Sequence, residues 1–331
     1  MQTWKACLSL QSAFGTPPKG DTLFGQLCWA ARNRFGKARL DELLFGYTQG
    51  RPYLVVSDAL PAGHLPRPLL PTSWFSDTHG DRKAMKKQVW LPLDKFCHPV
   101  AEWRTHCCSV EELPGAGVRA RSQPHNSINR ATNTTGEGFD PYNSEQLWYG
   151  QKATGRSVVP EPKLDLYMVW DETRMLANEL LMLLKDMGEL GFGRDAGIGL
   201  GRFRVGGWER FDLPGQPGAD AWLTLGPCAP QGLAWDGSRS FYQPFTRFGR
   251  HGDIGACLGN PFKSPVLLAD TGAVFAPLSQ AGDGSGSAAL FIGQGLGGDG
   301  SLSKVRGLEN TVHQGYAPTV AIRLPERGGI S

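Results

Sequence analysis

The chain has 331 residues, a formal net charge of +3 and 40% hydrophobic residues. This length suffices for two ordinary domains, and burial of so many apolar residues can offset the conformational entropy lost on folding, which excludes general disorder. The small positive charge permits a nucleic-acid partner but does not diagnose one.

The sequence also bears on where the protein works. It contains no signal-like N-terminal segment and no run of about 18 apolar residues, so we expect a cytoplasmic protein without a membrane partner. Seven cysteines are scattered along the chain, an odd number that does not fit the disulfide framework of a small secreted domain. We expect most of them to be reduced thiols.

The first part of the chain predicts a strand and a helix before a long irregular stretch. Residues 3–10 alternate apolar and polar side chains, as a half-buried strand does. Asp21 could cap a helix that places Leu23, Leu27 and Phe35 on one face. A short helix at residues 40–47 and a strand at 53–56 follow. Residues from about 60 to 161 show no strong period, and we interpret them as large insertions.

Regular patterns return in the middle of the chain. Residues 163–170 alternate as a strand, and residues 172–187 repeat apolar positions at helical spacing. The glycine-rich stretch GFGRDAGIGLG, residues 191–201, then leads into another strand. This order suits a ferredoxin-like βαββαβ sheet whose middle strands are hidden in the insertions.

The last third predicts a second, strand-rich unit. Residues 212–220 are rich in proline and glycine, as a linker is. Candidate strands follow at residues 221–225, 240–248, 265–268, 288–292 and 319–324, and the glycine-rich residues 280–300 predict a mobile or partner-ordered loop. The predicted α+β architecture thus has one domain at 1–211, with its insertion at about 60–161, and a second domain at 212–331.

The glycine-rich stretch at 191–201 has two interpretations. A dinucleotide fingerprint needs a strand before it and a helix after it, and here that order is reversed, which argues against a nucleotide cofactor. A backbone without side chains could approach phosphates closely, with Arg194 and Arg202 neutralising their charge. Alternatively, the stretch is a tight helix-to-strand connection whose glycines only supply unusual φ angles.

Several segments carry a resemblance to a known family. They are GDTLFGQLCWA (20–30), PYLVVSDALPAGHLPRPLLP (52–71), HNSINRATNTTGEG (125–138), NPFKSPVLLADTGAVF (260–275) and VHQGYAPTVAI (312–322). In this order, and with the glycine-rich stretch between a helix and a strand, they resemble the Cas-five group of the RAMP superfamily in type III CRISPR effector complexes. The resemblance is closest to the family of Csm subunit four, although Gly20 replaces its more usual serine.

The resemblance implies tandem ferredoxin-like (RRM-like) RAMP domains with large insertions. It also implies a non-catalytic subunit, without a cofactor, that binds and caps the 5′ handle of the guide crRNA. Such a subunit contacts a Cas-ten-type large subunit and starts a backbone of Cas-seven-type subunits. A protruding hairpin, or thumb, bends the guide in this family, and residues 126–149 are the candidate here.

The candidate RNA contacts lie in the family-like segments. Basic side chains suit phosphates and stacking, whereas amides and imidazoles suit the base edges of a single strand. The candidates are Lys19, His125, Asn126, Asn129, Arg130, Gly191, Gly193, Arg194, Gly197, Gly199, Gly201, Arg202 and Arg247. Phe192 and Phe203 are expected in the core beside the loop.

A second constellation combines Cys97 and His98 with His106, Cys107 and Cys108. Thiolates and imidazoles bind Zn²⁺, but this spacing lacks a CxxC pair. The alternative is a set of reduced cysteines in a packed insertion.

Two other functions stay open. A Cas-six-like RAMP endoribonuclease would process the crRNA precursor with His125 as its general base. Those enzymes carry the glycine loop near the C terminus, whereas about 130 residues follow Gly201 here. A protein-only scaffold would have the same fold, because fold alone does not assign function.

Overall fold

The structure is a computed structural model that describes residues 1–76, 82–113, 117–135, 138, 140–150, 161–257, 260–278 and 289–326. Its centre is an antiparallel sheet in the order β2-β8-β1-β9, made of β1 (Gln2–Leu10), β2 (Leu54–Pro61), β8 (Lys163–Trp170) and β9 (Phe203–Arg210). Helix α1 (Gly20–Phe35) connects β1 to β2, and α5 (Ala177–Leu190) connects β8 to β9. This is the ferredoxin-like βαββαβ topology, so the predicted fold class is confirmed.

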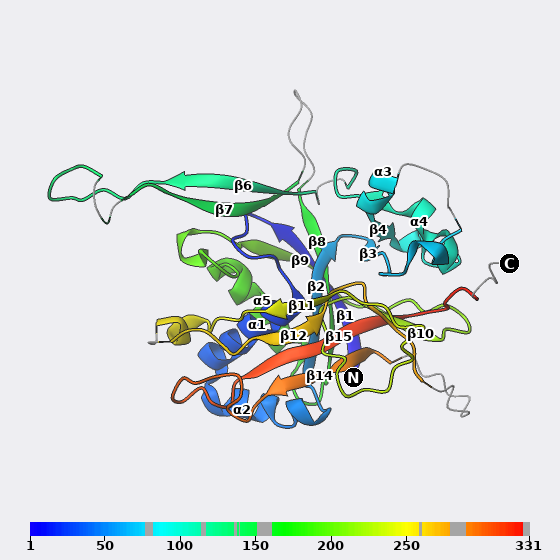
Figure 1. Cartoon of the computed structure of the whole chain (residues 1–331). Helices are drawn as coiled ribbons and strands as arrows, with labels where there is room; N and C mark the ends of the chain where they lie inside the picture. Colours follow the sequence, from blue (N-terminus) through cyan, green and yellow to red (C-terminus); the bar gives the residue numbers. More distant parts are fainter. Residues whose placement is uncertain are drawn as a thin grey trace.

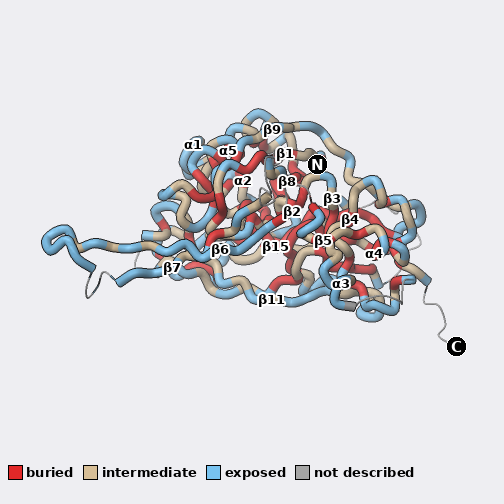
Figure 2. The backbone as a smooth tube through the Cα atoms, turned by 90° about the horizontal axis from the view of Figure 1, so that it is seen from above, coloured by how far each residue is buried: buried red, intermediate tan, exposed pale blue. Residues whose placement is uncertain are grey.

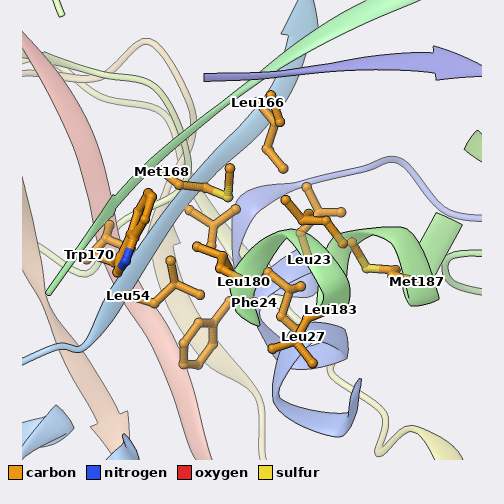
Figure 3. Packing of buried hydrophobic residues seen from close by; sticks show 14 of the residues in the cluster. Leu23, Phe24, Leu27, Leu54, Leu166, Met168, Trp170, Leu180, Leu183 and Met187 are labelled. Carbon is orange, nitrogen blue, oxygen red and sulfur yellow. The ribbon is translucent and has the colours of Figure 1, made fainter. Parts of the chain in front are cut away.

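Both helices cover one face of this sheet. Leu23 and Leu27 of α1 and Leu183 of α5 are at most 1% exposed, and they pack beside Leu166 and Met168 of β8 (Figure 3). Full burial of one such side chain stabilises the folded state by about 1.5–3 kcal/mol, so the helical apolar spacing fixes both helices on the sheet.

The framework strands differ from the prediction in extent. β2 continues to Pro61 and does not end near residue 56, because a register shift between Val56 and Ala59 carries the strand past Ser57 and Asp58. The second and third strands therefore flank the insertion, and the prediction that they are hidden inside it is wrong. α2 (Lys37–Leu44) and the 3-10 helix η1 (Tyr47–Gln49) match the short helix expected before β2.

α5 begins at Ala177 and not at residue 172. Asp171 Oδ1 accepts a hydrogen bond from Thr173 N at 3.0 Å, which forms a turn before the helix. Glu179 Oε2 then accepts from Leu176 N at 2.8 Å and satisfies a backbone donor at the helix start. Local side-chain bonds therefore set this boundary.

The insertion forms two separate bodies that the sequence did not predict in detail. The first, the insertion lobe, contains β3 (His64–Pro66), β4 (Gln88–Pro92), β5 (Cys108–Ser109), α3 (Arg82–Lys87), α4 (Trp103–His106), η2 (Thr72–Trp74), η3 (Leu93–Lys95) and η4 (Val100–Glu102). The second is a hairpin of β6 (Val118–His125) and β7 (Tyr142–Tyr149). The hairpin projects from the body, and most of its residues are exposed (Figures 1 and 2).

The second half of the chain is a strand layer. β10 (Ala221–Thr224), β13 (Val274–Phe275), β14 (Phe291–Gly297) and β15 (Val312–Ile322) form a sheet in the order β13-β10-β15-β14, and β11 (Pro244–Arg247) pairs with β12 (Val266–Ala269). Within the described part of residues 212–326, the helical elements reduce to the 3-10 helix η6 (Asp253–Cys257).

β14 corrects the loop prediction for residues 280–300. Its glycines are packing positions, since a Cβ on Gly295 would lie 2.6 Å from the carbonyl oxygen of Tyr47. Close backbone approach explains the glycine content at this place. Residues 280–288 of that prediction lie outside the described residues.

The two halves are joined by buried hydrogen bonds. The side-chain amide of Gln314 in β15 accepts from Val56 N at 2.9 Å and donates to Val56 O at 2.8 Å. Tyr316 donates its hydroxyl to Tyr47 O at 2.7 Å. The domain boundary at residues 212–220 stays a prediction. In the described part of the chain, no helix combines the length and apolar character needed to cross a bilayer.

Candidate RNA-binding site

The glycine loop, residues 191–201, connects α5 to β9 and folds against the segment after β1. Gly201 N donates to Ala13 O at 2.7 Å, and Phe192 N donates to Gly201 O at 2.9 Å. Gly191 and Gly201 have φ angles of 95° and 72°, and a Cβ on Gly201 would lie 2.1 Å from Phe192 O. These glycines are therefore required by the backbone itself. Phe192 and Phe203 are 1% and 3% exposed, as expected for core residues.

The outer part of the loop is open. A Cβ on Gly197 or Gly199 would meet no atom within 4 Å, although Gly199 has a φ of 99°. Gly197 lies within the 3-10 helix η5 (Ala196–Ile198) and Gly199 follows it, and Ile198 between them is 69% exposed. The loop thus divides into a packed base and an accessible outer turn.

A glutamine on α1 holds the base of the loop. Gln26 Oε1 accepts from Gly193 N at 3.0 Å, and Gln26 Nε2 donates to Gly191 O at 2.7 Å. Thr16 Oγ1 accepts from Arg194 N at 3.0 Å. The sequence did not identify Gln26, because nothing local relates this helix position to a loop far along the chain.

The two predicted arginines of the loop have different surroundings. Arg194 donates from Nη2 to the carbonyl oxygen of Glu145 in β7, and its Nε lies 3.4 Å from the Asp195 carboxylate. Arg202 is exposed, and its backbone N–H donates to Ser12 Oγ at 2.9 Å. Arg194 therefore connects the loop to the hairpin, while the Arg202 side chain faces solvent.

The root of the hairpin attaches to the same segment as the loop. Phe14 and Leu147 exchange backbone hydrogen bonds of 2.9 and 2.8 Å. The Phe14 ring also packs edge-on against Tyr149, with 5.6 Å between ring centroids. Residues 12–16 therefore anchor both the glycine loop and the hairpin.

One face of the hairpin carries cations and aromatic rings. The register pairs Arg119 with Trp148 and His125 with Tyr142. Arg121 lies on the same face as Arg119, and its guanidinium is 5.4 Å from the centroid of the Trp148 ring. His125 stacks on Tyr142 at 5.1 Å, and its Nε2 is 2.9 Å from Ser144 Oγ.

The sequence identified only His125 on this hairpin face. Trp148 and Tyr142 are 41% and 56% exposed, which is unusual for large aromatic side chains. The sequence signal that could have identified this face is the spacing of Arg119 and Arg121, because a strand places residues two positions apart on the same face.

The remaining hairpin candidates lie at its tip, between β6 and β7. Asn126 and Arg130 are exposed. Asn129 shapes the tip turn, because its Oδ1 accepts from Ala131 N at 2.9 Å and its N–H donates to Thr134 O at 3.0 Å. The tip is the part of the hairpin farthest from the body in Figure 1, so these residues do not join the loop arginines.

Lys19 and Arg247 lie near the start of α1 and have acidic partners. Lys19 Nζ is 2.9 Å from both Asp58 Oδ2 and Asp270 Oδ1. Burial alone would lower the pKa of Lys19, but the two carboxylates outweigh it and raise that pKa above its usual value. Arg247 pairs with Asp21 through two hydrogen bonds of 2.7 and 3.0 Å. Both predicted RNA contacts, Lys19 and Arg247, therefore also have a structural role.

Asp21 does not cap α1, so that prediction is wrong. The N-cap is Lys19, and Asp58 from β2 accepts from Gly20 N at 2.8 Å. The Asp21 carboxylate is fully buried between Arg247 and His313, whose Nε2 is 3.3 Å away. Burial would raise the pKa of Asp21, but His313 and Arg247 lower it to about 2. The role of Asp21 is therefore to pair with residues that are distant in the sequence, and not to cap its own helix.

The cysteines of the proposed zinc constellation are dispersed. Cys107 is 5% exposed in the core of the insertion lobe, Cys97 Sγ lies 3.9 Å from Asp94 O, and Cys108 Sγ lies 3.4 Å from Trp90 O. His98 and His106 do come together, with 4.4 Å between their ring centroids.

Comparison with known proteins places this fold in a family. A sequence model of the RAMP superfamily matches residues 19–204, while no curated protein sequence matches the chain. A chain of a Csm1–Csm4 cassette in complex with cA4 is similar in structure, with a TM-score of 0.58 and 14% identity. Chains of the cassette with AMPPNP and with pppApA give TM-scores of 0.56 and 0.55 at 16% identity. Each comparison covers 98% of this chain and 99% of the other. The matched region spans more than half of the chain and contains α1, β2, β8, α5 and the glycine loop, and the chain therefore belongs to the RAMP superfamily.

Proposed function

We propose that this protein is a non-catalytic, Csm4-like subunit of a type III CRISPR effector complex that binds and caps the 5′ handle of the guide crRNA. The observation that carries the proposal is the shared anchor at residues 12–16. Through Phe14 and Thr16 this segment holds an exposed arginine-bearing loop beside the root of a cationic, aromatic hairpin. Such a combination suits a single strand, whose phosphates need cations and whose bases need stacking surfaces.

The loop supplies the phosphate contacts in this proposal. Gly197 and Gly199 carry no side chains, so RNA phosphates can approach the backbone of the outer turn at these two positions. Arg202 contributes an exposed guanidinium. Arg194 contributes a second one, whose positive charge is partly neutralised by the nearby Asp195 carboxylate. These contacts give affinity without reading the sequence of the handle.

The hairpin supplies stacking contacts and acts as the thumb. Trp148 and Tyr142 are exposed on one face of the hairpin, where Arg119 and Arg121 lie beside Trp148 and His125 lies beside Tyr142. The guide would bend where the handle meets the spacer, next to the hairpin root. Asn126 and Asn129 at the tip provide the amides that distinguish base edges.

The proposal also assigns protein partners. We infer a Cas-ten-type large subunit on one side and a Cas-seven-type backbone subunit on the other. Support comes from the fold, which is similar to that of chains in Csm1–Csm4 cassettes. Crosslinking within an assembled complex tests both contacts, and a chain that links to neither subunit would contradict them.

The nuclease alternative has less support from the hairpin. General acid–base cleavage of RNA needs a second titratable group near the general base. His125 has Tyr142 as a titratable neighbour, but its Nε2 bonds to Ser144 Oγ, and its face of β6 and β7 carries no carboxylate, since Glu145 is on the opposite face.

Binding and cleavage assays on one RNA test the proposal. The full chain should bind an RNA with the correct 5′ handle more tightly than one with a scrambled handle, and should leave both intact. A unique cut that His125→Ala abolishes would replace the proposal with the nuclease alternative. An assembled complex that yields no crosslink between this chain and the handle would favour the scaffold.

A further inference from the structure

We propose that His98, Glu102 and His106 form a Zn²⁺ site in the insertion lobe, and we call these three residues the zinc triad. One ligand atom from each residue lies within 4.8 Å of the others. His98 Nδ1 is 3.8 Å from Glu102 Oε2, and the ring centroids of His98 and His106 are 4.4 Å apart. Two imidazole nitrogens and one carboxylate oxygen are a donor set that Zn²⁺ accepts.

The secondary structure explains why these residues meet. η4 and α4 form one continuous helical stretch, in which Glu102 and His106 are four residues apart and share a face. His98 precedes this stretch, and Glu102 N donates to Pro99 O at 2.9 Å, which turns the chain back toward His98. The spacing HxxxExxxH therefore projects three donors toward one point.

The backbone of His98 is held from two sides. Its carbonyl oxygen accepts from Trp103 Nε1 and from Gln216 Nε2, both at 2.8 Å. Trp103 is fully buried, and Gln216 also donates to Phe96 O at 3.0 Å. Preorganisation of this kind lowers the entropy that an ion must offset to collect its ligands.

The remaining adjustment is small. Zinc bonds of about 2.0–2.2 Å place tetrahedral ligand atoms roughly 3.4 Å apart, so the side chains must close by about 1 Å. The side chains of His98 and Glu102 are 40% and 49% exposed, which leaves them room to rotate. The solvent-facing side would supply water as the fourth ligand, as in zinc sites with three protein ligands.

The zinc triad lies beside the contacts that attach the insertion lobe to the last strand. Gln216 connects the lobe to the last strand, because its N–H donates to Ala321 O at 2.9 Å and its Oε1 accepts from Arg323 N at 2.8 Å. A bound ion would fix α4 against His98 and so strengthen the attachment of the lobe to β15. The triad contains none of the residues that we assign to RNA binding, so the two proposals are independent.

Zinc titration of the full, tag-free, EDTA-stripped chain tests the site. We expect one equivalent of Zn²⁺ per chain by calorimetry and metal analysis, together with a higher melting temperature in the presence of Zn²⁺. His98→Ala and His106→Ala should each weaken binding by at least the roughly 10-fold that loss of an outer-shell partner costs. With Zn²⁺ present, both variants should keep the melting temperature of the EDTA-stripped wild type. Their replaced histidine side chains contribute little to the core, so the replacements themselves should not lower it.

Cys97→Ser is the matched control. Cys97 adjoins His98 and is a zinc-binding residue type, but its sulfur bonds back to Asp94 O and stays outside the triad. This variant should bind Zn²⁺ like the wild type. A wild type without stoichiometric Zn²⁺ uptake, or histidine variants with unchanged affinity, would overturn the proposal. EDTA should leave binding of the RNA handle unchanged, so a failure of one proposal does not imply failure of the other.

Discussion

The guanidinium of Arg247 donates from Nε and Nη2 to the two carboxylate oxygens of Asp21, at 2.7 and 3.0 Å, across 226 positions of the sequence. Asp21 is fully buried in the first turn of α1, and His313 of β15 lies on its other side. One carboxylate thus connects the first helix to two strands of the second half. Replacing one partner of such a pair leaves the other without its charge complement in a buried place.

Asp21→Asn should lower the free energy of unfolding at pH 7 by at least about 2 kcal/mol, because the pKa of Asp21 is lowered from 3.8 to about 2. A lowered pKa in the folded state stabilises the protein above the unfolded pKa, and this contribution is lost as the pH falls from about 4 to about 2. Urea denaturation at pH 7 and pH 3 measures the difference.

The control is Asp41→Asn, which removes an exposed ion pair with Lys37. Such a pair contributes only about 0.3–0.5 kcal/mol on a helix surface. Equal stabilities of Asp21→Asn and the wild type at pH 7 would show that the buried ion pair gives no net stabilisation.

Arg202→Ala should weaken binding of the handle RNA most at low salt. Loss of one phosphate contact on a single strand lowers the slope of log K against log salt by about 0.7. Arg194→Ala should show the same change of slope and should also loosen the hairpin, because it removes the bond to Glu145 O. Binding titrations at several salt concentrations measure both effects.

Arg323→Ala removes the same charge from an exposed arginine at the end of β15, and it should bind handle RNA like the wild type. If both loop arginine variants bind like the wild type at every salt concentration, the loop is only a structural turn.

Trp148→Ala should weaken RNA binding by about 1–3 kcal/mol, the usual contribution of one stacked base. The salt slope should stay constant, because no charge is removed. Ser122→Ala, on the opposite face of the hairpin, is the control. An equal effect of both variants would exclude a specific stacking role for the cationic face.

Asn126→Ala should reduce the preference for the correct handle over a scrambled one, since an exposed amide at the tip is suited to base edges. Asn129→Ala should do so as well, but it also removes the bond to Ala131 N that shapes the tip. Competition between the two RNAs measures the preference. Unchanged discrimination in both variants would remove the tip from the proposed interface.

Gly201→Ala should destabilise the protein strongly, because the new Cβ would lie 2.1 Å from Phe192 O at a φ of 72°. Gly197→Ala should leave the melting temperature close to that of the wild type, while a bulky residue such as Gly197→Leu should weaken RNA binding. Melting curves and binding titrations separate these effects. RNA binding by Gly197→Leu at wild-type strength would argue against phosphates at the outer turn.

The parts of the fold that sequence predicts are those with a clear period. β1 and β8 alternate, and the apolar spacing within α5 identifies the face that it buries. The sequence did not predict β6, because seven of its eight residues are exposed and neither face of the strand is apolar. Gln26 and Asp21 acquire their roles from tertiary contacts, which no local pattern encodes.

The bond between Gln314 and Val56 also has a consequence for self-association. β2 is an edge strand of the central sheet, and an edge with unpaired peptide groups is a template on which a strand of another molecule can add. The Gln314 amide occupies both peptide groups of Val56, and further along β2 Asp58 N donates to Leu225 O and Ala59 N donates to Pro18 O. The chain therefore closes this edge with its own residues, so that neither a second copy nor an extended peptide can lengthen the sheet there.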